Sequence, residues 1–463
     1  MRIWLPLVAT CSGTFLLLVY STIVTVALPG IAQDLHADFG SLQWIIDVYT
    51  LALAGLLLGM GSLGDNLGRK RLYLTGLTVF GVATLACGAA ADVGVLIAAR
   101  AVQGLAGAAM FSTLLPLIGL TYTGRDKGVA FAVWGAVAGA AAGVGNVAGG
   151  ILTQFLSWQW IFYGGVPLCL ATVALSAAVL TDDTTTATRI DYLGIVSFTL
   201  AALGITFGII RGGEQGWSSG SAVLGFVVGA SMLVVFLLAE RAGSAPMISL
   251  TLFRKREFNG TLVAALGYYL AAFGALPVIS LWLQDGLGLS ALATALVITV
   301  QPVAFITTSA VAGSALHRLP AHRTLGGGAL TVGAGNVLLL ATGAVSSWAA
   351  LLPGLVVTGI GAGIVSPVLP SVAMAGAPAA QSGVASAAAN CARQLGLALG
   401  IAVLGSVFHQ CSPLSGGSDG QASYAPGLTA VFAVAAAIGL ASGGLALRLL
   451  RPQRPAVGPV QAV

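Results

Sequence analysis

The succession of long apolar runs is the feature that most constrains this chain. Each run holds about 20 or more mostly apolar residues, the length that a helix needs to cross the hydrocarbon core of a bilayer. Only 7% of the 463 residues are charged, against about 25% in soluble domains, so the chain cannot cover a water-facing surface. The bilayer core offers no hydrogen-bond partners to backbone N–H and C=O groups. An α-helix satisfies these groups within itself, so it can cross the membrane. The runs predict an all-α polytopic membrane protein with fourteen spans, near residues 4–30, 42–63, 72–91, 95–121, 128–153, 161–180, 192–211, 221–239, 260–283, 291–316, 325–344, 349–374, 383–408 and 426–450.

The positions of lysine and arginine test this count, because cytoplasmic loops carry an excess of both. If Arg2 is cytoplasmic, sixteen of the nineteen lie in segments on that side. Arg211 falls at an outer helix end, and Arg100 and Arg393 fall inside helices. We therefore expect both termini in the cytoplasm. The net charge of +5 follows from this topology and from attraction to anionic lipid, so it gives no reason to expect nucleic-acid binding.

Two segments on the expected cytoplasmic side resemble each other, GSLGDNLGRKR at 61–71 and GSALHRLPAHR at 313–323. Each would join the second and third helices of a six-helix block. Parallel repeats of this kind place the substrate path between two halves, near the bilayer midplane. We expect two six-helix bundles plus an inserted helix pair, divided as an amino-terminal bundle at 1–180, the inserted helices 7 and 8 with flanking loops at 181–255, a carboxy-terminal bundle at 256–450 and a cytoplasmic tail at 451–463.

The loop at 61–71 has a physical logic of its own. Gly61 and Gly68 permit a tight turn and close approach of helices. Asp65 can interact with Arg69 and with the positive end of the following helix. We interpret these four residues as a cytoplasmic gate. The alternative is a basic loop that only sets topology, which explains the cations but not Asp65 or the glycine spacing.

Several further motifs carry a family resemblance. They include VALPGIAQDL at 26–35, LQWIIDVYTLALAG at 42–55 and LIAARAVQGLAGAAM at 96–110. With the loop at 61–71, they resemble the major facilitator superfamily, in particular its fourteen-helix drug:proton antiporter branch. The resemblance implies secondary active export of hydrophobic drugs or antibiotics by alternating access, with no enzymatic activity and no cofactor. The Ala- and Gly-rich composition fits a GC-rich bacterial genome, so we expect a bacterial plasma (inner) membrane protein.

The chain departs from the pattern of this branch at two places. Relatives carry an acid in the first helix where Tyr20 stands, and an asparagine in place of Thr25. In the glycine-rich fifth helix, Asn146 replaces the proline of the antiporter motif, which puts the expected helix kink in doubt. The glycines of that motif are retained, at Gly145, Gly149 and Gly150.

Without the first-helix acid, another group has to carry the proton. Asp47 is the one acid of the chain that falls outside loops and helix ends, and Arg100 is a charge inside a helix, where charges mark functional sites. We hypothesise that they form a proton-linked pair with Tyr20 as a hydrogen-bonding neighbour. Alternatively, Asp47 sits at headgroup level beside Trp44, and Arg100 reaches the interface by snorkelling. A facilitator or importer without proton coupling is the competing function.

Aromatic and polar side chains near mid-membrane are candidates for the substrate cavity, because an apolar aromatic pocket with few polar anchors suits a bulky hydrophobic ligand. Packing within the bundle is the alternative for each of them. The expected partners are a hydrophobic small molecule, neutral or anionic rather than cationic, with protons and membrane lipid; we expect no metal site and a monomer. The cavity candidates are Tyr20, Thr25, Trp134, Tyr268, Tyr269 and Phe273.

Overall fold

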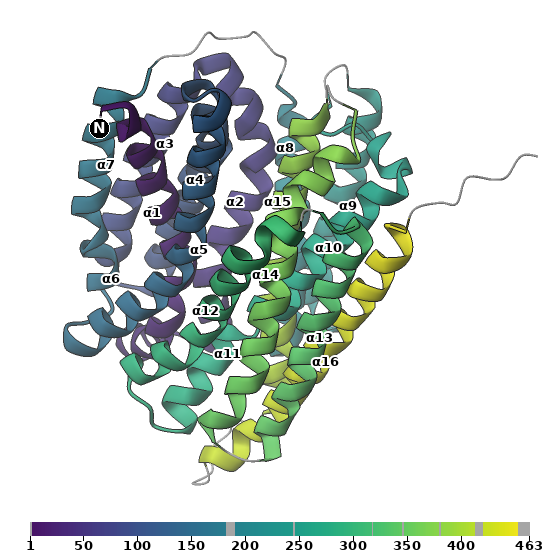
Figure 1. The fold of residues 1–463 in the computed structure, drawn as a ribbon. Coiled ribbons are helices and arrows are strands. Elements are labelled where there is room, and N and C mark those ends of the chain that lie inside the picture. The colour runs from purple at the N-terminus through teal and green to yellow at the C-terminus, as the bar shows by residue number, and fades with distance from the viewer. Residues whose placement is uncertain are drawn as a thin grey trace, which may run out of the picture.

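The computed structural model describes residues 2–181, 190–243, 246–316, 318–344, 347–378, 381–412 and 420–451. All regular elements in these ranges are helices, and fourteen of them are long and apolar enough to cross a membrane. The predicted all-α fold with fourteen spans is therefore confirmed. Figure 1 shows the amino-terminal helices on one side of the bundle and the carboxy-terminal helices on the other. Most of the expected loop at 181–189 and of the tail at 451–463 lies outside the described residues.

Six spans make up the amino-terminal half. Two of its helices begin at an aspartate that caps the first turn: Asp38 accepts from the Ser41 N–H at 2.8 Å, and Asp92 accepts from the Val95 N–H at 2.9 Å. Capping satisfies backbone donors that a helix start leaves unpaired. The half contains a short helix η1 (Arg2–Trp4), then α1 (Leu5–Leu35), α2 (Phe39–Leu67), α3 (Arg69–Gly88), α4 (Val93–Thr121), α5 (Gly124–Phe155), α6 (Trp160–Tyr163) and α7 (Gly165–Val179).

The next two spans form a hairpin, α8 (Tyr192–Gln215) and α9 (Gly220–Ala242), and α8 also packs against α2 and α15. The carboxy-terminal half follows, and its spans are interrupted by short 3-10 and π turns. Its elements are η2 (Leu252–Arg254), α10 (Arg256–Phe273), α11 (Leu276–Leu281), η3 (Trp282–Gly286), α12 (Ala291–Leu316), η4 (His322–Gly326), α13 (Gly327–Leu339), η5 (Leu340–Ala344), η6 (Trp348–Ala350), α14 (Leu351–Ala375), α15 (Ser382–Cys411) and α16 (Gly420–Leu449).

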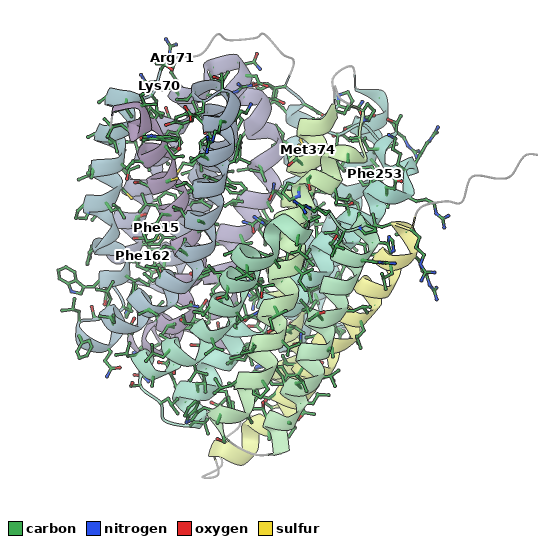
Figure 2. The ribbon with its side chains drawn as sticks, viewed as in Figure 1. Phe15, Lys70, Arg71, Phe162, Phe253 and Met374 are labelled. Atoms are coloured by element: carbon green, nitrogen blue, oxygen red, sulfur yellow. The ribbon has the colours of Figure 1, made fainter. Side chains whose placement is uncertain are left out.

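The two halves meet through α2 against α15 and α5 against α12. Two hydrogen bonds across this boundary lie toward one end of the bundle. The Gln43 amide donates to the Ile401 carbonyl at 2.9 Å, and the Gln284 amide donates to the Val26 carbonyl at 3.0 Å. The opposite end holds the amino terminus and the turn between α2 and α3, where Lys70 and Arg71 project from the bundle (Figure 2). We call these the sealed end and the terminal end.

Candidate functional site

Asp47 lies on the face of α2 that is turned toward the carboxy-terminal half. Gln43 precedes it by one helical turn and bonds to α15, and Ala54, two turns further on, accepts from the Cys391 thiol of α15 at 3.3 Å. The Asp47 side chain is fully buried, and neither carboxylate oxygen has a hydrogen-bond partner among the described residues. Burial without a partner favours the neutral, proton-bound carboxyl over the carboxylate. It also argues against an interfacial position beside Trp44.

Arg100 approaches α2 from its other side. Its Nε donates to the Ile45 carbonyl at 3.0 Å, one terminal nitrogen donates to the Gln103 side chain at 2.6 Å, and the guanidinium lies 4.2 Å from the centre of the Tyr49 ring. Ile45 and Asp47 differ by about 200° around the helix, and no ion pair joins Arg100 to Asp47 in the described part of the chain. The two charges therefore act on opposite faces of α2, and Arg100 is fully buried rather than snorkelling.

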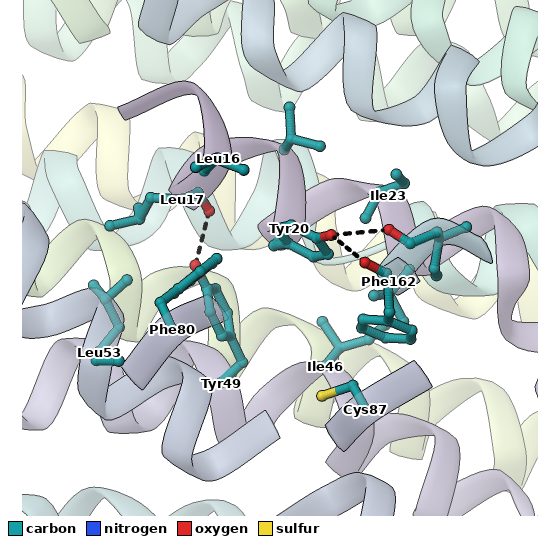
Figure 3. Close-up of a cluster of buried hydrophobic side chains, with 14 of the residues drawn as sticks. Leu16, Leu17, Tyr20, Ile23, Ile46, Tyr49, Leu53, Phe80, Cys87 and Phe162 are labelled. Atoms are coloured by element: carbon teal, nitrogen blue, oxygen red, sulfur yellow. Dashed lines mark hydrogen bonds between the residues drawn. The ribbon is translucent and has the colours of Figure 1, made fainter. Parts of the chain in front are cut away.

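Tyr20 points into the amino-terminal half rather than toward the other half. Its hydroxyl donates to the carbonyls of Ile161 and Phe162 at 3.0 and 3.2 Å (Figure 3). Its ring packs edge-on against Phe80 and parallel to Phe162, with centroids 5.6 and 6.0 Å apart. We expected Tyr20 to hydrogen-bond to Asp47 or Arg100, but neither is a partner of this hydroxyl among the described residues. The tyrosine side chain is long enough to reach the backbone of the sixth span instead.

The remaining cavity candidates fall into two groups. Thr25 and Tyr268 are buried within their own halves. Trp134 is half-buried and donates to the Thr14 hydroxyl at 2.8 Å, which holds α5 against α1. Tyr269 and Phe273 are half-buried on α10, with ring centroids 4.7 Å apart. Only the last two keep an exposed aromatic surface next to the boundary between the halves.

The glycine motif of α5 serves close packing on two sides. A Cβ added at Gly149 would lie 2.7 Å from the Ile23 carbonyl of α1, and one at Gly150 would lie 3.0 Å from the Ala291 carbonyl of α12. Gly145 likewise lies against α1, beside Thr22. The helix runs unbroken through Asn146, whose side chain is buried. The motif thus brings α1 and α12 together on a continuous α5.

The turn between α2 and α3 contains the expected acid–base contact. Arg69, the first residue of α3, donates to Asp65 near the end of α2 through two nitrogens, at 2.8 and 3.2 Å. Gly68 ends α2 and starts α3 with φ +92° and ψ 128°, a conformation that residues with a Cβ rarely adopt. No atom lies within 4 Å of a Cβ added at Gly61, so that glycine has room for a larger residue.

The sequence matches the family description Major Facilitator Superfamily over residues 10–401, with a second match over 260–462. The chain belongs to the major facilitator superfamily. It is therefore a transporter and a multi-pass membrane protein rather than an enzyme. Among solved structures, the superfamily fold is similar to a peptide transporter POT in complex with sulfate, with a TM-score of 0.71, 14% identity and coverage of 97% of this chain and 96% of that one.

Curated relatives of the chain include proteins of Streptomyces and Mycolicibacterium species. The puromycin resistance protein pur8 of Streptomyces alboniger is 34% identical over 415 residues, covering 88% of this chain and 82% of the relative. The probable actinorhodin transporter of Streptomyces coelicolor is 31% identical over 421 residues, covering 88% and 72%. The multidrug efflux pump LfrA of Mycolicibacterium smegmatis is 30% identical over 409 residues, covering 88% and 81%.

Two side chains at the boundary of this superfamily member were not assigned a role from the sequence. Gln43 joins α2 to α15 through backbone carbonyls, and its partner lies about 360 positions away, so no local pattern points to it. Arg393 was noted only as a charge inside a helix. Its guanidinium lies 5.2 Å from the centre of the Tyr269 ring. Its charge near mid-membrane was the one sequence feature that could have indicated a functional role.

Proposed function

We propose that this transporter exports hydrophobic small molecules by alternating access, in exchange for protons. The relatives named above, which include antibiotic resistance, antibiotic transport and multidrug efflux proteins, support the direction and the substrate class. The observation that carries the proton coupling is the buried, unpartnered carboxyl of Asp47 at the boundary of the two halves.

The chemistry of the coupling follows from the burial of Asp47. When substrate binds from the terminal end, Asp47 releases its proton toward that side, and the ionised carboxyl reaches outer water when α2 and α15 part at the sealed end. Bringing the helices together again removes that water, and an ionised, unpartnered carboxylate would make this step costly by several kcal/mol. A proton taken up from the outer side makes closure possible. Return of the protein to the state open at the terminal end is thereby tied to one proton.

Arg100 is proposed to position this carboxyl rather than to exchange protons with it. It holds the Ile45 carbonyl two residues before Asp47, and Gln103 extends the network to Thr84 on α3 at 2.7 Å. These bonds fix the rotation of α2 about its axis. Tyr20 has a similar supporting role for α1. The Asp65–Arg69 turn with Gly61 and Gly68 is proposed as the gate at the terminal end.

The proposed architecture places this cycle between two six-helix bundles. We assign residues 1–180 and 256–450 to the bundles and 181–255 to an inserted pair, in keeping with the packing of α9 on α8 and of α8 against one helix of each bundle. The terminal end is assigned to the cytoplasm because the cationic loops lie there. The protein is proposed to act as a monomer.

Asp47→Asn tests the proposal, because asparagine has a similar shape but cannot exchange a proton. In proteoliposomes, we expect the wild type to concentrate actinorhodin or tetracenomycin C, the compounds named for two of its relatives, when a pH gradient is imposed. The variant should lose this pH-driven flux while it retains exchange of labelled for unlabelled substrate. Asp47→Glu should restore part of the coupling.

Asp92→Asn is the matched control, since the same chemical change at a helix cap leaves a side chain that still caps. Its pH-driven flux should equal that of the wild type. Unchanged coupling in Asp47→Asn would remove Asp47 from the mechanism. Wild-type flux that is indifferent to the gradient would instead identify a facilitator without proton coupling.

A further inference from the structure

We propose that Arg393, Tyr268, Tyr269 and Phe273 form a binding site for the acidic group and aromatic ring of the substrate, so that the preferred substrates are hydrophobic organic anions. This inference deepens the proposed function and rests on it. We call the four residues the anion site. The acidic group can be a carboxylate, a sulfonate or an ionised phenol, because each presents oxygens to a guanidinium.

The anion site lies deep in the carboxy-terminal half. Arg393 is about 16 Å along α15 from Ser382, and Tyr269 is about 20 Å along α10 from Arg256. Both helices start at the terminal end, so both residues are near the middle of the bundle. The Arg393 guanidinium lies 5.2 Å from the centre of the Tyr269 ring, close enough for a cation–π contact that holds it in place.

Arg393 has no acid to balance its charge in the part of the chain that the structure describes. Arg69 and Arg211 pair with Asp65 and Glu214, at 2.8 and 3.0 Å. The ionisable groups that act on Arg393 are two tyrosines, Tyr268 and Tyr269, with no carboxylate among them. A cation at membrane depth is costly unless it has a partner or faces a watery space. An anionic substrate supplies the missing partner.

Hydrogen-bonding capacity is also left open at the anion site. The Nε of Arg393 has no hydrogen-bond partner among the described residues, and the buried hydroxyl of Tyr268 lies next to the side chains of Arg393 and Ser366. Both can donate to an acidic oxygen. A guanidinium that donates to such a group through two nitrogens forms one of the stronger contacts found in proteins.

The anion site lies one helical turn from residues that pack near the boundary between the two halves. Leu397 packs against a mainly amino-terminal apolar cluster that also contains Leu281 and Ile401, and Phe273 packs against a mainly carboxy-terminal cluster that includes Val26 of α1. Arg393 and Tyr269 each lie one helical turn from these contacts, in the direction of the terminal end. Their side chains are half-buried rather than buried. They therefore lie close to the boundary between the halves, at about the level where Cys391 bonds to Ala54.

The aromatic part of the anion site suits a flat ring system. The ring centroids of Tyr268 and Tyr269 are 5.2 Å apart, and those of Tyr269 and Phe273 are 4.7 Å apart. The row runs along α10 from the guanidinium toward the contact between the halves. Asp47 is turned away from it, because Cys391 marks the face of α15 that meets α2 and Arg393 is about 200° from Cys391. No fixed negative charge on α2 thus opposes an anion.

A set of ligands that differ only in charge tests this inference. 9-Anthracenecarboxylate, 9-anthracenecarboxamide and 9-anthracenemethylammonium share one fluorescent ring and carry charges of −1, 0 and +1. Binding to the full-length protein in lipid nanodiscs is followed by fluorescence anisotropy. We expect the wild type to bind the carboxylate at least tenfold more tightly than the amide, and the ammonium most weakly.

Arg393→Gln should abolish this preference while it leaves amide binding within about twofold, and Arg393→Lys should reduce the preference without abolishing it. The matched control Arg211→Gln, at an outer helix end, should keep the wild-type preference. If Arg393 had only a structural role, its replacement would weaken the binding of all three ligands equally. The ratio of the affinities for the carboxylate and the amide is therefore the deciding quantity. If Arg393→Gln does not fold, the ratio in Arg393→Lys decides.

The inference is overturned if the wild type shows no preference for the carboxylate, if it binds none of the ligands, or if the preference survives in Arg393→Gln. Failure of the proposed function is seen separately, as an absence of pH-driven flux of actinorhodin or tetracenomycin C. A protein that binds the carboxylate through Arg393 but does not pump would contradict export and leave the anion site standing.

Discussion

Tyr20→Phe removes a single oxygen from the residue that stands where relatives carry an acid. The structure indicates that this hydroxyl holds the first span against the sixth, through the carbonyls of Ile161 and Phe162. We therefore expect the variant to be less stable but still fully coupled to protons. The change separates a supporting role of Tyr20 from a role in proton transfer.

The size of the effect follows from the contacts of Tyr20. The ring is 2% exposed, and its packing on Phe80 and Phe162 is kept in the variant. What is lost is one buried donor shared by two acceptors, which costs about 1 to 3 kcal/mol. In a mid-sized domain, each kcal/mol lowers the melting temperature by about 2 to 4 °C. A larger protein shifts less, so a fall of several degrees at most is expected.

The assay combines thermal unfolding of the purified protein with pH-driven uptake in proteoliposomes. Tyr49→Phe is the matched control, because the Tyr49 hydroxyl also donates to a carbonyl of α1, that of Leu17 at 2.7 Å. Both variants should melt earlier and keep the wild-type ratio of flux with and without the gradient. A stable Tyr20→Phe that exchanges substrate but ignores the gradient would refute the reasoning and place the hydroxyl on the proton path.

Three further predictions concern helix ends and helix contacts. Gly68→Ala should destabilise the protein by about 1 to 3 kcal/mol, because a Cβ strains the backbone at φ +92°. Thermal unfolding measures this loss. Gly61→Ala is the control and should leave the melting temperature unchanged, because a Cβ at Gly61 meets open space. Gly149→Val should abolish substrate flux by forcing α5 away from the Ile23 carbonyl, and normal flux would contradict the packing. Asp38→Ala should cost about 1 kcal/mol at pH 7 through loss of the α2 cap. Hydrogen bonds from Ser41 hold the pKa of Asp38 below its usual range, so the difference should be present above about pH 4 and fade as the pH falls below the usual carboxyl range; a difference that grows in acid would contradict this.

Much of the fold could be predicted from the chain because the bilayer constrains each segment separately. The length and apolar character of a run decide whether it spans, and the fourteen expected runs correspond to the fourteen candidate spans of the structure. The contact between Asp65 and Arg69 could also be predicted, since an acid and a base four residues apart across a tight turn are close in space.

The candidate site was predicted less completely. Sequence depth placed Tyr20, Asp47 and Arg100 in one layer, and Arg100 is indeed an electrostatic neighbour of Tyr20. The depth of a residue in the membrane does not say toward which neighbouring helix its side chain points. The structure turns Asp47 toward α15 while Arg100 bonds to the opposite face of α2, and it turns Tyr20 into its own bundle. These directions depend on which helix lies next to which.

The sequence by itself thus determined what each segment is: an apolar helix of spanning length, with its charges, caps and glycines at fixed positions along it. Only the tertiary structure decided which side chains meet. Asp47 is unpartnered because α15 covers it, and Arg393 faces two tyrosines because α10 lies beside α15. The physical reason is that local rules act over one or two helical turns, whereas the partners of a buried polar group are set by the packing of segments hundreds of residues apart.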